Sequence, residues 1–305
     1  MIDGSIPGPA VSVVVPTYNR RDSLRRLLAS LDQQTLDPKS FEIVVVDNNS
    51  SDGTRDIVRD FARGRHVNEP AQGAAHARNR GIRETSSPLI AFIDDDVEAD
   101  SAWLEEIVRG FADSGAAAVG GRTEPVWETP RPEWWLPEYD KVFARNWGDT
   151  PRPVTEFPFF YSLNFAVRRE TLVAVGDFDP RLGPKAGEHV VGEDADLCRR
   201  IHQSGRMLRY LPGAVVRHHV SEDRLSPAFL RRRFYYSGMT HARQRCIEGR
   251  SLETSYQAKQ LAIGIARWAV CRSRVERFRR ELEVWHRAGF LRVGLERDPD
   301  GRNVG

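Results

Sequence analysis

The N-terminal third of the chain alternates short apolar runs with segments whose apolar residues recur at helical spacing. Near-continuous apolar runs at residues 11–15, 41–46 and 89–93 are typical of parallel strands covered on both faces. Between them the spacing predicts helices over residues 22–31, 54–61 and 74–84. Such alternation builds βαβ units with right-handed crossovers. We therefore predict an α/β fold with a Rossmann-like, mostly parallel central sheet flanked by helices.

The pattern after residue 100 is less regular. It predicts helices over residues 103–111, 168–175 and 193–204, and short strands over 116–121, 162–167, 207–210 and 212–216. Residues 122–160 are rich in proline and tryptophan and predict a long ordered loop. Its Trp134 and Trp135 could stack on a sugar or fill a core, and the pattern leaves both open. Two further helices are predicted over residues 227–245 and 254–287.

Polar residues follow three of the predicted strands. They are Pro16-Thr17-Tyr18-Asn19, Asp47-Asn48-Asn49 and Asp94-Asp95-Asp96. Ligands of open α/β sheets bind outside the carboxyl ends of the strands, so we expect these residues to share one edge.

The acidic triplet at residues 94–96 has two interpretations. In an extended segment Asp94 and Asp96 share a face and Asp95 points away. Two carboxylates so placed suit Mg²⁺ or Mn²⁺, which take oxygen ligands and are commonly shared with substrate phosphates. Burying several anions would in any case require a cation. The alternative is a solvated acidic turn, which charge runs usually form.

A second group of acids, Glu193 and Asp194, stands at the start of a predicted helix. Acids there suit the helix dipole, so capping competes with catalysis as an explanation. His218 ends a predicted strand and is either a metal ligand or an ordinary polar residue.

Composition excludes several classes of protein. With 305 residues, of which 40% are hydrophobic and 29% charged, the chain is typical of a globular protein. The three cysteines lack the spacing of a disulfide framework or a zinc site. No glycine-rich turn follows the first strand, which argues against a dinucleotide dehydrogenase and a nucleotidyl transferase. No apolar run is long enough to span a bilayer and no secretory signal is evident, so we expect a cytoplasmic location.

The C-terminal quarter is basic. From residue 224 onward there are 18 Lys and Arg against 8 Asp and Glu, a net charge of +10, whereas the preceding residues carry −8. This segment is predicted to be a solvated helical face, a peripheral contact with anionic membrane, or a helical dimer or domain contact. It has no nucleic-acid-binding motif, so nucleic acid is not expected as a partner. The oligomeric state is left open.

Taken in order, the motifs resemble those of the family 2 glycosyltransferases with the GT-A fold. The resemblance rests on residues 13–20, 45–54, 73–81, 92–96, 163–169, 176–179, 192–194 and 212–218. These include Pro16-Thr17-Tyr18-Asn19-Arg20, Phe92-Ile93-Asp94-Asp95-Asp96 and Gly192-Glu193-Asp194. The resemblance implies a GT-A domain over residues 10–222, with a nucleotide-binding half (10–121) and an acceptor and catalytic half (122–222). Residues 223–305 would be a basic helical extension.

The resemblance also implies roles for single residues. Asp194 matches the proposed general base, and Glu193 is its neighbour at the acceptor. Asp96 matches the ligand of a Mn²⁺ or Mg²⁺ ion, with His218 as a further ligand. The predicted nucleotide-binding residues are Pro16, Thr17, Tyr18, Asn19, Asp47, Arg78, Asp94 and Asp95. The predicted sugar and acceptor residues are Gly121, Asn164, Trp134 and Trp135.

The expected function is therefore metal-dependent, inverting transfer of a sugar from a nucleoside-diphosphate donor, with UDP-sugar as the first choice. The acceptor would be a hydroxyl of a glycan or of a lipid-linked sugar, at the inner face of a membrane. The alternative is a non-catalytic protein that only binds nucleotide sugars.

Overall fold

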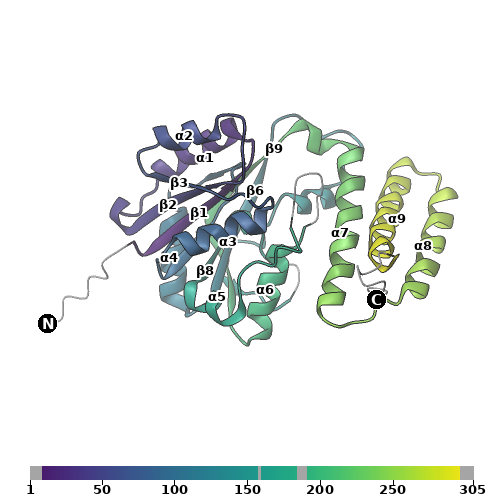
Figure 1. Ribbon diagram of the computed structural model, residues 1–305. Helices are drawn as coiled ribbons and strands as arrows, with labels where there is room; N and C mark the ends of the chain where they lie inside the picture. The colour runs from purple at the N-terminus through teal and green to yellow at the C-terminus, as the bar shows by residue number, and fades with distance from the viewer. Residues whose placement is uncertain (1–8, 157–158, 184–190, 296–305) are drawn as a thin grey trace. The chain divides into compact units, whose positions relative to one another are not determined.

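The first apolar run forms the central strand of the computed structural model, which describes residues 9–156, 159–183 and 191–295. All seven residues of this strand, β1 (Val11–Thr17), are buried. Continuous burial requires cover on both faces of the sheet, as the pattern predicts. The predicted α/β class is confirmed, with helices on both sides of one sheet (Figure 1).

The further strands are β2 (Phe41–Asp47), β3 (Gly64–Asn68), β4 (Leu89–Phe92), β5 (Val97–Ala99), β6 (Ala118–Trp127), β7 (Arg152–Pro153), β8 (Phe165–Arg168) and β9 (Leu208–Val220). The helices are α1 (Arg21–Asp32), α2 (Thr54–Asp60), α3 (Ala74–Glu84), α4 (Trp103–Ser114), α5 (Arg169–Val175), α6 (Glu193–Gln203), α7 (Pro227–Ile247), α8 (Thr254–Ala269) and α9 (Arg274–Leu295). Short 3₁₀ turns are η1 (Pro38–Ser40), η2 (Pro137–Val142), η3 (Ser162–Asn164) and η4 (Glu222–Leu225).

The strand order is β3-β2-β1-β4-β8-β6-β9-β5, with β7 paired to β9. The first four strands are parallel, as predicted. The second half is mixed, because β8 runs antiparallel to both β4 and β6. The chain proceeds outward from β1 to β3 and then returns to β4 on the other side of β1. The carboxyl ends of β1 and β4 therefore flank a topological switch point, where open α/β sheets bind ligands.

Alternate residues of the strands build two cores, one on each face of the sheet. Val13 and Val15 of β1 pack with apolar residues of α1, α2 and α4. Val14 faces the other way and packs with residues of α3, α5 and α6. Each strand is thus fixed in register, since a slip by one residue would exchange its two faces.

Four sequence predictions of element limits are wrong. The strand expected over residues 162–167 begins only at Phe165, after the 3₁₀ turn Ser162–Asn164. The other three fail for local reasons. The two strands expected around Pro212 form the single strand β9, in which residues 212–214 bulge out of the pairing with β6; bulges are where a sheet accepts proline. Strand β6 extends to Trp127, into the expected loop. The helix expected over 254–287 is interrupted after Ala269, and α9 restarts where Ser273 Oγ accepts from Glu276 N (3.3 Å).

The chain divides into two compact units. Unit 1 is the described part of residues 1–127, 136–181 and 193–220, and holds the sheet. Unit 2 comprises residues 128–135, the described part of 182–192 and that of 221–305. The predicted boundary after residue 222 stays a prediction, and residues 296–305 of the predicted extension lie outside the described residues.

Unit 2 is built on α7, α8 and α9, in which α9 packs against both α7 and α8 (Figure 1). Two glycines let α7 and α9 approach closely: a Cβ on Gly238 would lie 1.8 Å from His286 O, and one on Gly289 would lie 1.9 Å from Tyr235 O. None of the helices among the described residues combines the length and the apolar character needed to cross a membrane.

Candidate active site

The site begins where β1 and β4 end, at the switch point of the sheet. Thr17, the last residue of β1, donates from Oγ1 to Asp95 Oδ2 at 2.8 Å, and both residues are buried. Thr17 O in turn accepts from Asn48 N (2.9 Å), which ties the end of β2 to the same edge. The edge predicted from the three polar segments therefore exists, and its centre is a buried carboxylate.

The acidic triplet, residues 94–96, does not continue strand β4. We call these three residues the acidic turn. Strand β4 ends at Phe92, and Asp95 and Asp96 occupy a turn before β5 begins at Val97. The predicted separation of Asp95 from Asp96 across two faces is wrong, because alternation holds only in extended backbone. Arg20 Nη1 instead contacts both, at 3.0 Å from Asp95 Oδ1 and 2.6 Å from Asp96 Oδ2.

Asp94 belongs to a second ionic cluster, centred on Arg78 of α3. The buried guanidinium donates from Nη2 to Asp94 Oδ1 (2.8 Å) and from Nη1 to Glu193 Oε1 (2.7 Å). Its Nε is also buried and has no hydrogen-bond partner among the described residues. Arg78 thus joins three elements: the helix that carries it, the acidic turn, and the start of α6.

Glu193 and Asp194, the first two residues of α6, have different partners. Glu193 faces Arg78 and is buried, whereas Asp194 accepts backbone N–H groups from Ser162 (3.3 Å) and Ala195 (2.7 Å). These two donors orient the Asp194 carboxylate beside the acidic cluster. A third acid of this turn, Asp196, pairs with Arg199 and Arg200 within the helix and is structural.

Burial shifts two of these carboxyl groups. Burial raises the pKa of Asp95 to about 6, and Asp96 adds to this shift while Arg20 opposes it. Burial and the neighbouring Asp194 also raise the pKa of Glu193, against the effect of Arg78. Both shifts mean that the two arginines do not fully offset the cost of burying these anions. Such a site favours an additional cation.

The residues around Asp96 fit a divalent cation. On β9, His218 places Nε2 3.6 Å from Asp96 Oδ2, and its Nδ1 lies 3.0 Å from Phe143 O. Donation from Nδ1 to a carbonyl leaves Nε2 as the lone-pair nitrogen, the arrangement usual for ligand histidines. Two atoms about 3 to 4 Å apart can share an ion bound at about 2.1 Å. No group of three or more His, Cys, Asp or Glu suited to a metal occurs within the described residues, so Asp96 and His218 supply only part of a coordination shell.

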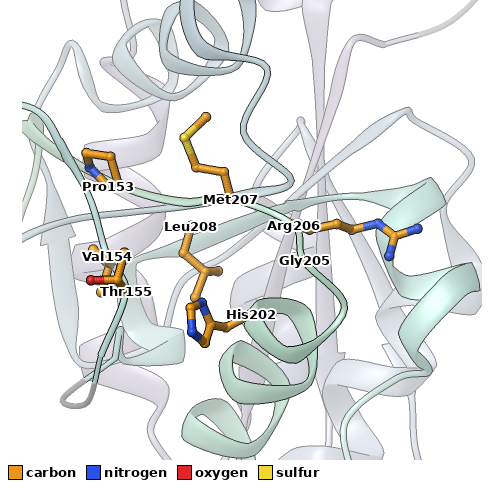
Figure 2. Close-up of a pocket in the computed structure, with 8 residues that line it drawn as sticks. All are labelled: Pro153, Val154, Thr155, His202, Gly205, Arg206, Met207 and Leu208. Atoms are coloured by element: carbon orange, nitrogen blue, oxygen red, sulfur yellow. The ribbon is translucent and has the colours of Figure 1, made fainter.

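A separate hollow of about 220 Å³ lies between β7, the end of α6 and the start of β9 (Figure 2). In Figure 2 His202 and Thr155 face each other across it, and the side chain of Arg206 points away. Its lining contains no carboxylate and none of the residues described above. We do not assign the active site to it.

The family assignment follows from comparison with known proteins. The model of "Glycosyl transferase family 2" matches residues 12–177, which is more than half of the chain and spans β1, Arg78 and the acidic turn. This chain belongs to glycosyl transferase family 2. It is a glycosyltransferase, which agrees with the resemblance of its motifs and disfavours the alternative of a protein that only binds nucleotide sugars.

Named relatives of this transferase act in glycoconjugate biosynthesis. It is 31% identical over 236 residues to a glucosyl-dolichyl phosphate glucuronosyltransferase of Haloferax volcanii, covering 75% of each chain. It is 27% identical over 268 residues to the succinoglycan biosynthesis protein ExoM of Rhizobium meliloti, covering 86% of this chain and 82% of that protein.

A solved structure shares the fold. The mannosyltransferase PcManGT from Pyrobaculum calidifontis, in complex with GDP-Man and Mn²⁺, has a TM-score of 0.64 and 20% identity, covering 94% of this chain and 86% of that one. It supports the predicted GT-A fold of the transferase.

The remaining predicted nucleotide residues lie around the ends of β1 and β2. Asp47 ends β2 and is held by Ser50 N (2.8 Å) and by His66 Nε2 (3.3 Å). Asn19 adopts a positive φ of 51° and links to the loop after β2, donating from N to Ser50 and accepting from Ser51. The ring of Tyr18 is 43% exposed. Their contacts with a nucleotide stay predictions.

Pro16 lies on the central strand β1, an unusual position for proline. The pairing of β1 with β4 ends at Val14, whose carbonyl accepts from Ile93 N. Thr17 O accepts from Asn48 N on the β2 side. Because neighbouring residues of a strand direct their backbone groups to opposite sides, Pro16 faces β4, beyond the last residue that pairs with β4. The missing N–H therefore removes no ladder bond, and the two strands separate next to the acidic turn.

The predicted sugar and acceptor residues are distributed between the units. In unit 1, Asn164 is buried, donating from Nδ2 to Arg122 O and Ala214 O and accepting from Trp103 Nε1, each at 2.9 Å. A Cβ on Gly121 would meet Ala214 O at 1.8 Å, so the glycine permits this close packing. Trp134 and Trp135 are in unit 2, where Trp134 contacts Trp135 and Phe278. A sugar contact by any of these residues stays a prediction.

Sequence reasoning missed the role of Arg20. The motif predicts a cation beside the triplet but points to a metal alone. The available signal was an arginine directly after the first strand and its short loop, on the edge where the carboxylates were expected.

Replacing Arg78 by Met tests whether this arginine holds the acidic turn and the start of α6 together. The change leaves Glu193 buried without its cation, so we expect the free energy of unfolding to fall by about 3–5 kcal/mol. Arg80→Met on the same helix is the control: it removes a surface pair with Glu84 and should cost less than about 1 kcal/mol. Urea unfolding of the full chain measures both. Equal losses would contradict the bridging role.

Proposed function

We propose that this family 2 transferase is a metal-dependent, inverting enzyme that moves a sugar from a nucleoside-diphosphate donor to a hydroxyl of a glycan or lipid-linked acceptor. One observation carries the proposal: Arg78 links Asp94 of the acidic turn to Glu193, beside Asp194, at the switch point of the sheet. Residues suited to the leaving diphosphate and a residue suited to the acceptor hydroxyl thus belong to one cluster.

The donor end of the reaction is assigned to the edge formed by β1, β2 and the acidic turn. Thr17, Asp47, Arg78 and Asp94 are the residues proposed to hold base and ribose. The buried Nε of Arg78, which has no partner among the described residues, supports a further hydrogen bond to a ligand. UDP remains our first choice of carrier nucleotide. The mannosyltransferase PcManGT is in complex with GDP-Man, so GDP is the alternative carrier.

Asp96 and His218 are proposed to hold Mn²⁺ or Mg²⁺ together with the donor diphosphate. When bound, such an ion supplies Lewis-acid stabilisation of the negative charge that develops on the leaving diphosphate. The Mn²⁺ in the neighbouring solved structure supports this choice of cofactor.

At the acceptor end Asp194 would take the proton of the attacking hydroxyl. The acceptor oxygen forms a bond to the anomeric carbon as the bond from that carbon to the diphosphate oxygen breaks, and the diphosphate leaves with the electron pair. Attack opposite the leaving group inverts the anomeric configuration. The N–H groups of Ser162 and Ala195 hold Asp194 in place during this transfer. Glu193, occupied by Arg78, serves to position the start of α6.

The acceptor is proposed from the relatives and from unit 2. The similarity to a glucosyl-dolichyl phosphate glucuronosyltransferase supports a lipid-linked acceptor. Helix α8 has no buried residue and no acid, exposes Tyr256 and Ile265, and carries Lys259 and Arg267. A helix with these features suits the surface of an anionic membrane, so we propose peripheral contact there.

Donor and metal are tested by thermal shift of the full chain with UDP- and GDP-sugars, with and without Mn²⁺. A ligand that binds only the folded state at 100 times its Kd adds about 2.7 kcal/mol to stability. We expect one donor to raise the melting temperature only with the metal, and EDTA to abolish release of its nucleoside diphosphate. Metal-independent turnover would contradict the role given to Asp96.

Asp194→Asn tests the proposed base. The variant should keep the donor-induced thermal shift, because the donor is bound at the other end of the cluster. Sugar transfer should fall by about 10²- to 10⁴-fold, the usual contribution of general base catalysis. Asp56→Asn, on the exposed surface of α2, is the matched control and should keep full activity. Wild-type turnover by Asp194→Asn would remove the assignment.

Membrane contact is checked by co-sedimentation with vesicles. We expect binding to vesicles with anionic lipid, weak binding to neutral vesicles, and release by salt, because screening weakens attraction between exposed charges. Binding that does not depend on anionic lipid would remove the proposal.

A further inference from the structure

Arg20 ends the first motif, but neither the predicted site residues nor the proposed chemistry include it, and its side chain lies between the donor edge and solvent. Its side chain is 41% exposed, whereas those of its partners Asp95 and Asp96 are 6% and 12% exposed. The guanidinium therefore covers the acidic turn from its solvent side.

The backbone at Arg20 is held by hydrogen bonds, whereas its side chain is exposed. Arg20 O accepts from Leu24 N (2.9 Å) at the start of α1, and the next residue, Arg21, donates from N to Asp52 Oδ2 (2.9 Å). The side chain itself is long, exposed and held through Nη1. Its release from the acidic turn would break the two ion pairs and leave the backbone hydrogen bonds of Arg20 and Arg21 in place.

Arg20 and a metal ion would need the same atom. Asp96 Oδ2 accepts from Arg20 Nη1 at 2.6 Å and also lies 3.6 Å from His218 Nε2. A divalent ion between Asp96 and His218 would lie within a few ångströms of the guanidinium, and two cations so close repel strongly. Occupation of Asp96 by Arg20 and by a metal ion are therefore competing states.

We propose that Arg20 occupies the acidic turn before the donor binds and moves onto the donor diphosphate, as a donor-binding residue, when a divalent cation takes Asp96. The inference rests on the proposed function, in which Asp96 meets the metal. The donor supplies what the arginine needs in its second position, because guanidinium binds diphosphate oxygens in bidentate geometry.

This exchange makes metal and nucleotide binding interdependent. Arg20 opposes the metal when it binds alone and favours the nucleoside diphosphate once the metal is bound. By linkage, the nucleotide must then raise the affinity for the metal by the same factor by which the metal raises the affinity for the nucleotide. Removing Arg20 should reduce that factor.

The experiment is titration of the full-length protein with Mn²⁺, followed by the electron paramagnetic resonance signal of free Mn²⁺, with and without UDP or GDP. Arg20→Met should bind Mn²⁺ alone at least tenfold more tightly than wild type, and the gain in affinity from nucleotide should be at least tenfold smaller. Arg25→Met is the matched control, since it removes one positive charge from an exposed i,i+3 pair on α1; it should behave as wild type.

Arg20→Lys gives an independent test if the Met variant does not fold. Lysine keeps the charge beside Asp96 but not the planar fork, so Mn²⁺ alone should bind as weakly as in wild type while the gain from nucleotide falls.

The opposing results are distinct. An unchanged Mn²⁺ affinity and an unchanged gain in Arg20→Met would overturn the exchange, as would weaker Mn²⁺ binding, which would make Arg20 only a support of the turn. Absence of Mn²⁺ binding to wild type with either nucleotide would instead overturn the proposed metal role of Asp96, and the inference with it.

Discussion

The site depends on one buried cation. Arg78 holds Asp94 of the acidic turn and Glu193 of α6, residues almost one hundred positions apart in the chain. Burying this guanidinium is tolerable only because both carboxylates accept its hydrogen bonds, and burying Glu193 is tolerable only because Arg78 is there. The pair therefore fixes the start of α6, and with it Asp194, against the edge of the sheet. The geometry of the acceptor side follows from a constraint that is primarily electrostatic.

The sheet supplies the other constraint. At the switch point β1 and β4 separate, and Pro16 lies on β1 where no ladder bond toward β4 is needed. Beyond the last paired residues of the two strands, a buried hydrogen bond joins Thr17 to Asp95. The acidic turn is thus held between a rigid strand and β5, whose pairing with β9 sets Val97 opposite His218. Two separate parts of the fold bring Asp96 and His218 within 3.6 Å of each other.

The sequence predicts the N-terminal half well because its information is local. A pattern of only a few residues predicts each element there: an apolar run predicts each of β1, β2 and β4, and the spacing of the leucines predicts α1. What fails depends on distant partners or on very short segments. Strand β5 has three residues, too few for a periodicity, and it exists because β9 pairs with it. Arg20 and the acidic turn are 75 and 76 positions apart, so no spacing rule connects them.

The folded site contains positive charges that the acidic motif alone does not show. The motif contains three carboxylates and by itself suggests a metal site. The folded chain also brings Arg20 and Arg78 to the same carboxylates. Even so, burial keeps the pKa of Asp95 and that of Glu193 raised, which means that the arginines do not fully offset the cost of burying these anions. A cluster left in this state is stable enough to fold and still gains from a further cation. That surplus of negative charge, held in place by the surrounding strands, is what makes the edge of the sheet suited to metal and donor diphosphate together.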